Sequence, residues 1–207
     1  MCNVKIKTRK NTFERKKEIV DAVLKIIGER GLSSLSTKTI AEEVGVTTGA
    51  LFRHFASREE ILREVTRFAI LQIKETFPDE SISPLERIKL LAKNRIMLLN
   101  SCNGLAWLLK SEQAFLTLPK DSVESLRSMM KGSKRFLLKS IKDGINEGSI
   151  RNDIDPEVLI VIIMGTIHSM IGLPGTKNSS NKKQLSEIKK VLNGLEIMIS
   201  KTSSNSK

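Results

Sequence analysis

Hydrophobic residues recur along most of this chain with the three- and four-residue spacing of an amphipathic α-helix. The spacing is repeated at three places: by Val20, Val23, Leu24 and Ile27, by Ile61, Leu62, Val65, Phe68 and Ala69, and by Leu185, Ile188, Leu192, Leu195 and Ile199. Such stripes bury one face of a helix and leave charged residues on the other. Strand-like alternation is rare. The pattern predicts an all-α protein with about nine helices, four of them short.

Pairs of polar residues mark where several helices are expected to begin. A side-chain oxygen at the N-cap, followed three residues later by Glu or Gln, satisfies backbone N–H groups that have no partner in the helix. These starts are Asn11 with Glu14, Ser57 with Glu60, Ser83 with Glu86, Asp121 with Glu124, Asn181 with Gln184, and Asp155 before Pro156. Their agreement with the apolar stripes supports the helical assignment.

The stretch LSTKTIAEEVGVTTGALFRHFASREEIL carries the clearest local signal. Ser36 can cap a short helix over residues 37 to 44, Gly45 ends it, and Thr47 can cap a second short helix. Two short helices joined by a glycine turn are typical of a helix-turn-helix unit. Its small core is predicted to contain Ile40, Ala41, Val44, Val46, Leu51 and Phe55.

The second of these helices is expected to face outward near its start. Thr48, Gly49 and Ala50 are small enough for another surface to approach the backbone, and Arg53 and His54 follow them. A helix N-terminus offers N–H groups and positive partial charge to a phosphate. Outward side chains of such a helix reach base edges in a DNA major groove. The stretch therefore predicts contact with DNA.

Residues 16 to 70 resemble the DNA-binding domain of the tetracycline-repressor (TetR) family. The match to the family's pattern is made by Gly31, Thr37, Ile40, Ala41, Gly45, Val46, Gly49, His54, Phe55, Ser57 and Glu59. The chain departs from the pattern at two positions. Phe52 replaces the usual Tyr, whose hydroxyl binds a phosphate, so that contact should be lost or replaced. Arg58 replaces the usual Lys and keeps its charge.

The resemblance implies roles for individual residues of the head. Thr37, Thr39, His54 and Arg58 would hold phosphates. A second group would face DNA bases or the nearby DNA backbone, with Phe52 beside it: Thr47, Thr48, Gly49, Ala50 and Arg53. The ordinary alternative for His54 is a packed or capped side chain.

Charge supports a polyanionic partner. The 207 residues carry a net charge of +12, which favours nucleic acid or an anionic membrane surface. Residues 1 to 17 contain seven basic side chains and one acidic, a net charge of +6. This arm either adds sequence-independent affinity for DNA or is a solvated tail. No signal peptide is expected there, and the two distant cysteines suit a reducing cytoplasm.

The remainder of the chain is expected to form a larger domain. By resemblance it holds a small-molecule pocket and makes a homodimer through its last two long helices. The sequence agrees, because the helix from 156 to about 173 is apolar on every side and needs a partner over both faces. Residues 158 to 176 fall short of a membrane span. We expect residues 1–57 to form the basic arm and helix-turn-helix domain, 58–77 a connecting helix, 78–201 the ligand-binding and dimerisation domain, and 202–207 a disordered tail.

Adaptable or aromatic side chains in the larger domain are candidates for lining the pocket. They are Met97, Cys102, Trp107, Phe115, Met130, Phe136, Met164 and His168. The alternative for each residue taken singly is an ordinary core position. His168 differs from the rest, because it is the titratable group of an uncharged helix and needs a partner if it is buried.

The sequence therefore predicts a cytoplasmic, nucleoid-associated regulator that binds a palindromic operator on double-stranded DNA. It would be a repressor released by an apolar or amphipathic small molecule. The alternative is an architectural or division-linked DNA-binding protein of the same fold without a metabolite. We expect no cofactor, metal, membrane contact or catalytic residue, because the chain has no Gly-rich phosphate loop, metal-ligand spacing or catalytic triad.

Overall fold

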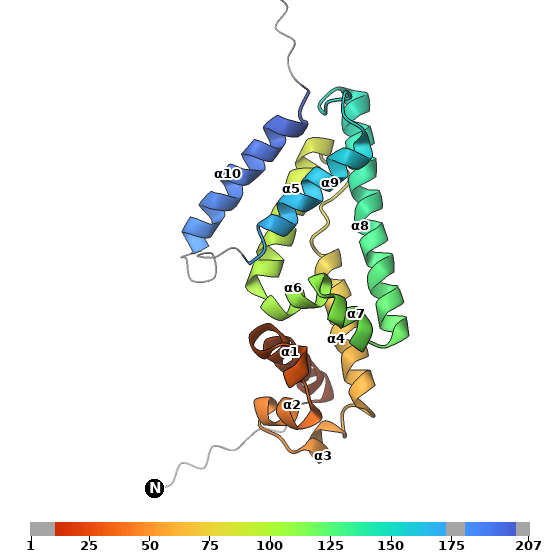
Figure 1. Cartoon of the computed structure of the whole chain (residues 1–207), viewed down its shortest axis with the longest axis vertical. Coiled ribbons are helices and arrows are strands. Elements are labelled where there is room, and N and C mark those ends of the chain that lie inside the picture. Colours follow the sequence, from red (N-terminus) through yellow and green to blue (C-terminus); the bar gives the residue numbers. More distant parts are fainter. Residues whose placement is uncertain (1–10, 173–180, 202–207) are drawn as a thin grey trace, which may run out of the picture.

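The computed structural model describes residues 11–172 and 181–201, and within these ranges the fold is built from α-helices (Figure 1). The helices are α1 (Thr12–Arg30), the 3-10 helix η1 (Leu32–Ser34), α2 (Thr37–Val44), α3 (Thr48–Leu51), α4 (Arg58–Lys74), α5 (Pro84–Ser101), α6 (Asn103–Lys110), α7 (Glu112–Thr117), α8 (Lys120–Glu147), α9 (Pro156–Ser169) and α10 (Asn181–Ile199). The all-α prediction is confirmed, with ten α-helices in the described ranges rather than about nine. The arm before residue 11 and the tail 202–207 lie outside the described residues.

Most of the predicted helix starts are present. Asn11 and Glu14 form a reciprocal capping box, and Ser57 and Asp155 each accept a backbone N–H of the first turn. Ser83 is the N-cap of α5 and Pro84 its first residue, as predicted, although the Ser83 side chain makes no cap hydrogen bond.

The predicted helix start at Asp121 is wrong. Pro119 occupies the N-cap, so α8 begins at Lys120 and Asp121 lies inside the helix. The Asp121 carboxylate accepts a 2.9 Å hydrogen bond from Nε of Arg63 in α4. Asp121 therefore ties α8 to α4 instead of capping a helix. The predicted cap at Asn181 depends on a side chain outside the described residues.

Two hydrophobic clusters hold the helices together. The first joins the head to the helices above it, with Ile19, Phe55 and Leu62 packed in one cluster with Leu105 and Leu126. The second fills the space among α5, α8, α9 and α10. In Figure 1 the small helices α2 and α3 lie at one end, and α5, α8, α9 and α10 lie at the other. The first cluster therefore gives the head a packed connection to the larger bundle.

α1 and α6 cross at very close range. A Cβ added to Gly104 would lie 1.9 Å from the carbonyl oxygen of Leu24, and one added to Gly28 would lie 2.6 Å from the amide nitrogen of Gly104. Both neighbours are backbone atoms, so neither side can give way. The two glycines let the helix backbones touch where the head meets the bundle.

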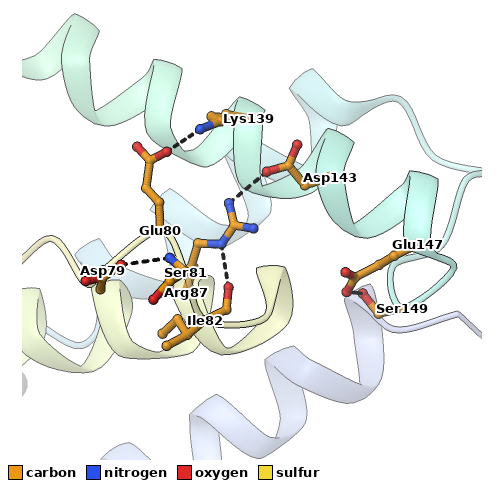
Figure 2. Close-up of polar contacts among 9 residues, drawn as sticks. All are labelled: Asp79, Glu80, Ser81, Ile82, Arg87, Lys139, Asp143, Glu147 and Ser149. Atoms are coloured by element: carbon orange, nitrogen blue, oxygen red, sulfur yellow. Dashed lines mark hydrogen bonds and ion pairs between the residues drawn. The ribbon is translucent and has the colours of Figure 1, made fainter.

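The segment that follows α4 is tied to α8 by polar contacts (Figure 2). The guanidinium of Arg87, which is buried, donates 2.8 Å to the Asp143 carboxylate and 2.9 Å to the Ile82 carbonyl. Glu80 forms an ion pair with Lys139. These contacts fix the connection between α4 and α5 against α8.

The helix predicted to run from 156 to about 173 is shorter than expected and is covered on one side. α9 ends at Ser169, and it buries Leu159, Ile163 and Ile167 while Val161 stays 69% exposed. Within the described ranges, no helix combines the length and apolar character that a membrane crossing requires.

Candidate functional site

The helix-turn-helix forms as the local sequence predicts. The Ser36 hydroxyl accepts the Thr39 N–H at 3.0 Å, and Gly45 ends α2 in the left-handed conformation at φ 71° and ψ 40°. The Thr47 hydroxyl then accepts the Ala50 N–H at 3.1 Å and starts α3. Leu51 and Phe55 are buried beneath it. Two caps and one glycine therefore set the turn, and the buried pair anchors α3 to the head.

The predicted base-facing residues lie together at the free surface of α3. Thr47, Thr48, Gly49 and Arg53 are exposed, and Ala50 is partly buried. The Thr47 hydroxyl is engaged in the cap, so its contribution to a partner is limited to its second lone pair and its methyl group. α3 is one turn long, and residues 52–54 continue as a turn.

The predicted phosphate-holding residues flank this surface. Thr37 and Thr39 are partly buried on the first turn of α2, and Arg58 is partly buried at the first turn of α4. His54 has its Nδ1 atom buried without a hydrogen-bond partner among the described residues. Phe52 is 44% exposed and presents an apolar ring where the family's usual residue has a hydroxyl. The arrangement offers hydroxyls, an imidazole and a guanidinium around an apolar ring.

A second candidate site is a cavity of about 440 Å³ inside the larger bundle. It lies among α5, α6, α8 and α9. Its lining residues are Leu91, Arg95, Leu99, Leu109, Lys110, Met129, Met130, Ser133, Lys134, Ile160, Met164, Ile167 and His168. Among the residues that the structure describes, no Asp or Glu contributes to this wall. The cavity is therefore apolar with a positive charge balance.

Arg95 is the buried charge of this cavity. Its side chain comes from α5, the residue is 8% exposed, and its Nε donates 3.0 Å to the Thr76 hydroxyl. The guanidinium carbon lies 5.5 Å from the centre of the Phe77 ring. Its Nη2 atom is buried and has no hydrogen-bond partner in the described part of the chain. Burial lowers the pKa of Arg95 to about 10.

Three cationic or titratable groups surround the outer part of the cavity. Lys110, Lys134 and His168 are exposed residues of its lining, whereas Arg95 is buried at the inner wall. Lys134 pairs with Glu157 at 2.6 Å. Partial burial lowers the pKa of His168, and the positive charges of Lys110 and Arg95 lower it further. With Lys134 paired to Glu157, Lys110 supplies the positive charge excess of this mouth.

The predicted pocket residues are divided among several places. Met130, Met164 and His168 line the cavity, and their role as ligand contacts stays a prediction. Cys102 lines a separate cavity of about 390 Å³ between α1 and α5. Phe136 lines an open groove of about 720 Å³ between α4 and α8, where its ring meets Phe77 edge-on at 5.1 Å.

The other three predicted pocket residues line none of these three cavities. Met97 is 42% exposed on the surface of α5. Trp107 and Phe115 pack, partly buried, against the first hydrophobic cluster. Their assignment as ligand contacts remains a prediction without support from the cavity walls.

Sequence reasoning missed the charged lining of the cavity. One signal was available for Arg95: it occupies a position of the apolar stripe made by Ile88, Leu91 and Leu99, where a charged residue is out of place. Lys110 and Lys134 gave no such signal, because lysines on exposed helix faces are common.

Comparison with known proteins agrees with this geometry. The family model described as bacterial regulatory proteins of the tetR family matches residues 19–65. The transcriptional repressor KstR2 of Mycobacterium tuberculosis is 26% identical over 156 residues, which cover 73% of this chain and 77% of the relative. The relatives named here are transcriptional regulators.

Solved structures share the whole fold. The ketosteroid regulator KstR2 superposes with a TM-score of 0.77 at 20% identity, covering 91% of this chain and 96% of that one. AibR, solved with isovaleryl coenzyme A and operator DNA, has a TM-score of 0.73 at 19% identity, covering 89% and 97%. FadR of Bacillus subtilis, solved with stearoyl-CoA, has a TM-score of 0.62 at 22% identity, covering 86% and 96%.

Proposed function

Because the chain belongs to the TetR family of bacterial regulatory proteins, we propose that it is a ligand-released transcriptional repressor. It binds a palindromic operator as a homodimer in the cytoplasm, at the chromosome. An amphipathic, anionic small molecule enters the cavity among α5, α6, α8 and α9 and weakens operator binding. The observation that supports this proposal is that one chain has both an exposed helix-turn-helix and an apolar cavity with a cationic mouth.

DNA binding rests on the surface of α3 and its flanks. Thr48, Gly49 and Arg53 face the major groove, where small residues allow close approach and Arg53 donates to base edges. His54 and Arg58 bind phosphates on either side. Neither Arg53 nor Arg58 forms an ion pair within the described residues, so both guanidinium groups are free to meet DNA.

The homodimer rests on apolar faces that α9 and α10 leave open. Val161 and Val158 on α9 are 69% and 49% exposed, and Ile197 and Met198 on α10 are 78% and 54% exposed. Exposed Gly165 is placed where a second backbone could come close. Joining these faces across a two-fold axis buries the side chains in a four-helix interface.

The effector class follows from the cavity and from the relatives. The cavity combines apolar side chains such as Leu99 and Ile167 with cations at its mouth. A coenzyme A thioester has a matching division into an apolar acyl chain and a polyanionic carrier, and two structural relatives were solved with such thioesters. We therefore propose an acyl thioester or a related amphipathic acid.

Release requires only that the ligand prefer a conformation that fits the operator poorly. The two recognition helices of a dimer must lie about 34–36 Å apart, or a multiple of this, to enter successive major grooves. A ligand that binds better to a different spacing lowers operator affinity by that difference alone. An architectural protein without a metabolite has no need of the cavity, so the cavity supports the ligand-responsive alternative.

The test is a titration of the purified protein against its own upstream DNA and a scrambled duplex at several salt concentrations. We expect tight binding to the native duplex alone, and weaker binding when decanoyl-CoA is added. Equal binding to both duplexes would contradict operator recognition and favour the architectural alternative. Specific binding that no acyl thioester or acid weakens would contradict the proposed release.

A further inference from the structure

We propose that Arg95 is the receptor for a carboxylate of the effector, which it holds at the inner wall of the cavity. This inference rests on the proposed function and specifies the chemistry of its ligand. It concerns the buried part of the cavity wall, whereas Lys110, Lys134 and His168 are exposed lining residues.

Arg95 is a buried, positioned cation that no carboxylate of the described residues neutralises. Its Nε is held by the Thr76 hydroxyl at 3.0 Å, and its face lies over the Phe77 ring. These two contacts fix the plane of the guanidinium without neutralising its charge. The buried Nη2 has no partner among the described residues, although buried polar groups are almost always hydrogen-bonded.

The other buried arginine of α5 shows how the protein satisfies such a group when no ligand is involved. Arg87 is 7% exposed, donates to the Asp143 carboxylate at 2.8 Å and to the Ile82 carbonyl at 2.9 Å (Figure 2). Arg95, two turns further along the same helix, meets no carboxylate within the described part of the chain. The missing partner is therefore expected to be the equivalent of Asp143, supplied from outside.

A carboxylate fits this wall better than a polyphosphate does. Guanidinium groups bind carboxylates with paired, charge-assisted hydrogen bonds. The inner wall around Arg95 is formed by apolar side chains, including Leu91, Leu99 and Ile167. These apolar side chains cannot bind the additional charges of a polyphosphate, which would stay buried without partners. A carboxylate carries one charge, and one guanidinium neutralises it. A coenzyme A moiety is better matched by the exposed lysines of the mouth.

Arg95 also links the ligand to the DNA-binding head. Thr76 directly follows Glu75, the C-cap of α4, and its carbonyl accepts a 3.3 Å hydrogen bond from the Asn94 side chain. α4 continues to the head through Ser57 and Phe55. A carboxylate that binds the guanidinium therefore acts, through Thr76, next to the end of the helix that carries the head.

The test compares two ligands of equal chain length, decanoate and 1-decanol, by isothermal titration calorimetry without DNA. We expect the unaltered protein to bind decanoate at least tenfold more tightly than decanol. In the Arg95→Gln variant the ratio of decanoate affinity to decanol affinity should fall to near one, while the affinity for decanol stays unchanged. An unchanged ratio in that variant would overturn the proposal.

Two further variants keep this result interpretable. Arg87→Gln removes the matched buried arginine, which does not line the cavity, and should leave the decanoate-to-decanol ratio unchanged. Arg95→Lys keeps the charge and should retain part of the ratio, even if Arg95→Gln folds poorly by circular dichroism. If Arg87→Gln lowered the ratio as much as Arg95→Gln, the effect would be general destabilisation and the receptor role would be contradicted.

Decanoyl-CoA distinguishes a carboxylate from a coenzyme A phosphate as the group that binds Arg95. Loss of affinity for decanoate in Arg95→Gln supports a carboxylate at the inner wall. Loss for decanoyl-CoA alone would place a phosphate there and overturn the proposal. Operator titration of the unaltered protein is a separate measurement, so a failure of repressor function is distinguishable from a failure of ligand recognition.

Discussion

At the scale of single residues, the unpaired charge of Arg95 is the main energetic anomaly. Its pKa falls to about 10 because burial removes water from the charged form. The side chain is protonated at neutral pH in both the folded and the unfolded chain, so the cost is fully present there. A depression of this size corresponds to about 3 kcal/mol against folding. A buried charge that destabilises the ligand-free protein in this way is typical of a residue that serves function rather than stability.

Replacing Arg95 with Met should therefore stabilise the ligand-free protein. The change removes the desolvated charge, and Thr76 keeps its hydrogen bond to the Ile73 carbonyl. After the lost ring contact and hydrogen bond, we expect a net gain of about 1 kcal/mol and a rise in Tm of about 2–4 °C. Thermal unfolding followed by circular dichroism measures it. Arg87→Met is the comparison and should lower Tm, because Asp143 loses its partner; a fall in both variants would contradict the argument.

His168 should make the binding of acids depend on pH. Its pKa is lowered by partial burial, by Lys110 on α6 and by Arg95 on α5, while Lys134 faces the same cavity from α8. Without ligand, protonation favours the unfolded chain, so this residue's contribution to stability falls as the pH drops below about 6.5. A bound anion reverses the preference and raises the pKa. Binding therefore takes up a proton.

We expect decanoate affinity to rise as the pH falls below about 6.5, the ordinary pKa of an imidazole, because the lowered pKa keeps His168 neutral in the ligand-free protein and a bound anion favours its protonation. In His168→Gln this rise should be absent. Calorimetry in two buffers of different ionisation enthalpy measures the proton uptake directly. Equal pH dependence in both proteins would show that another group is responsible.

Phe52 offers a gain-of-contact test at the DNA surface. The ring is 44% exposed beside α3, and a Tyr at this position would add the hydroxyl that the family's usual residue directs at a phosphate. We expect Phe52→Tyr to tighten operator binding about fivefold, equivalent to about 1 kcal/mol for one added hydrogen bond. Fluorescence anisotropy with the native duplex measures the change. An unchanged affinity would mean that the ring does not lie against the backbone of DNA.

At the scale of helices, the α1–α6 crossing is the element that joins the two sites. The N-terminal end of α6 touches α1 through Gly104, and its C-terminal end contributes Leu109 and Lys110 to the cavity. One short helix therefore spans from the ligand wall to the first helix of the head. Contact between backbones makes this connection stiff, because no flexible side chain lies between them.

Gly104→Ala should damage this crossing. The new Cβ would lie 1.9 Å from the Leu24 carbonyl oxygen, which forces the helices apart. We expect a loss of about 1–3 kcal/mol in the free energy of unfolding, measured by urea denaturation. Gly132→Ala in α8 is the matched control, since nothing lies within 4 Å of its Cβ, and it should gain up to about 1 kcal/mol. Equal effects of the two substitutions on the free energy of unfolding would contradict this account of the crossing.

At the scale of the whole molecule, the proposed homodimer depends on the exposed faces of α9 and α10. Their apolar side chains sit beside the second hydrophobic cluster, at the end of the molecule away from α2 and α3 (Figure 1). A dimer formed there leaves both recognition surfaces free. Its geometry also couples the spacing of the heads to the packing around the cavity, because α9 lines the cavity and carries the exposed face.

The double variant Val161→Glu and Ile197→Glu should be monomeric. Four glutamates would be brought together in the proposed dimer interface, and desolvated like charges oppose association. We expect light scattering to report a monomer and operator affinity to fall by about 100-fold or more, because each half-site is then bound alone. Leu116→Glu on α7, where the side chain is 85% exposed away from α9 and α10, should remain dimeric. A dimeric double variant would exclude this interface.

The sequence by itself determined the local features, which depend on residues close together in the chain. Ser36, Gly45 and Thr47 specify the turn of the helix-turn-helix within about a dozen residues, and the apolar stripes specify helices. Each of these signals is local, because caps and glycine turns act on backbone groups a few residues away. The predicted start at Asp121 failed for a local reason too, because Pro119 occupies the N-cap of α8.

The tertiary structure alone decided where the cavity lies and what lines it. Met130, Met164 and His168 reach the cavity, whereas Trp107 and Phe115 pack into the first cluster, and their residue types do not distinguish these outcomes. Arg95 acquires its unpaired, buried state from helices far away in the sequence. Burial is set by which helices meet, and this depends on contacts that no local pattern encodes.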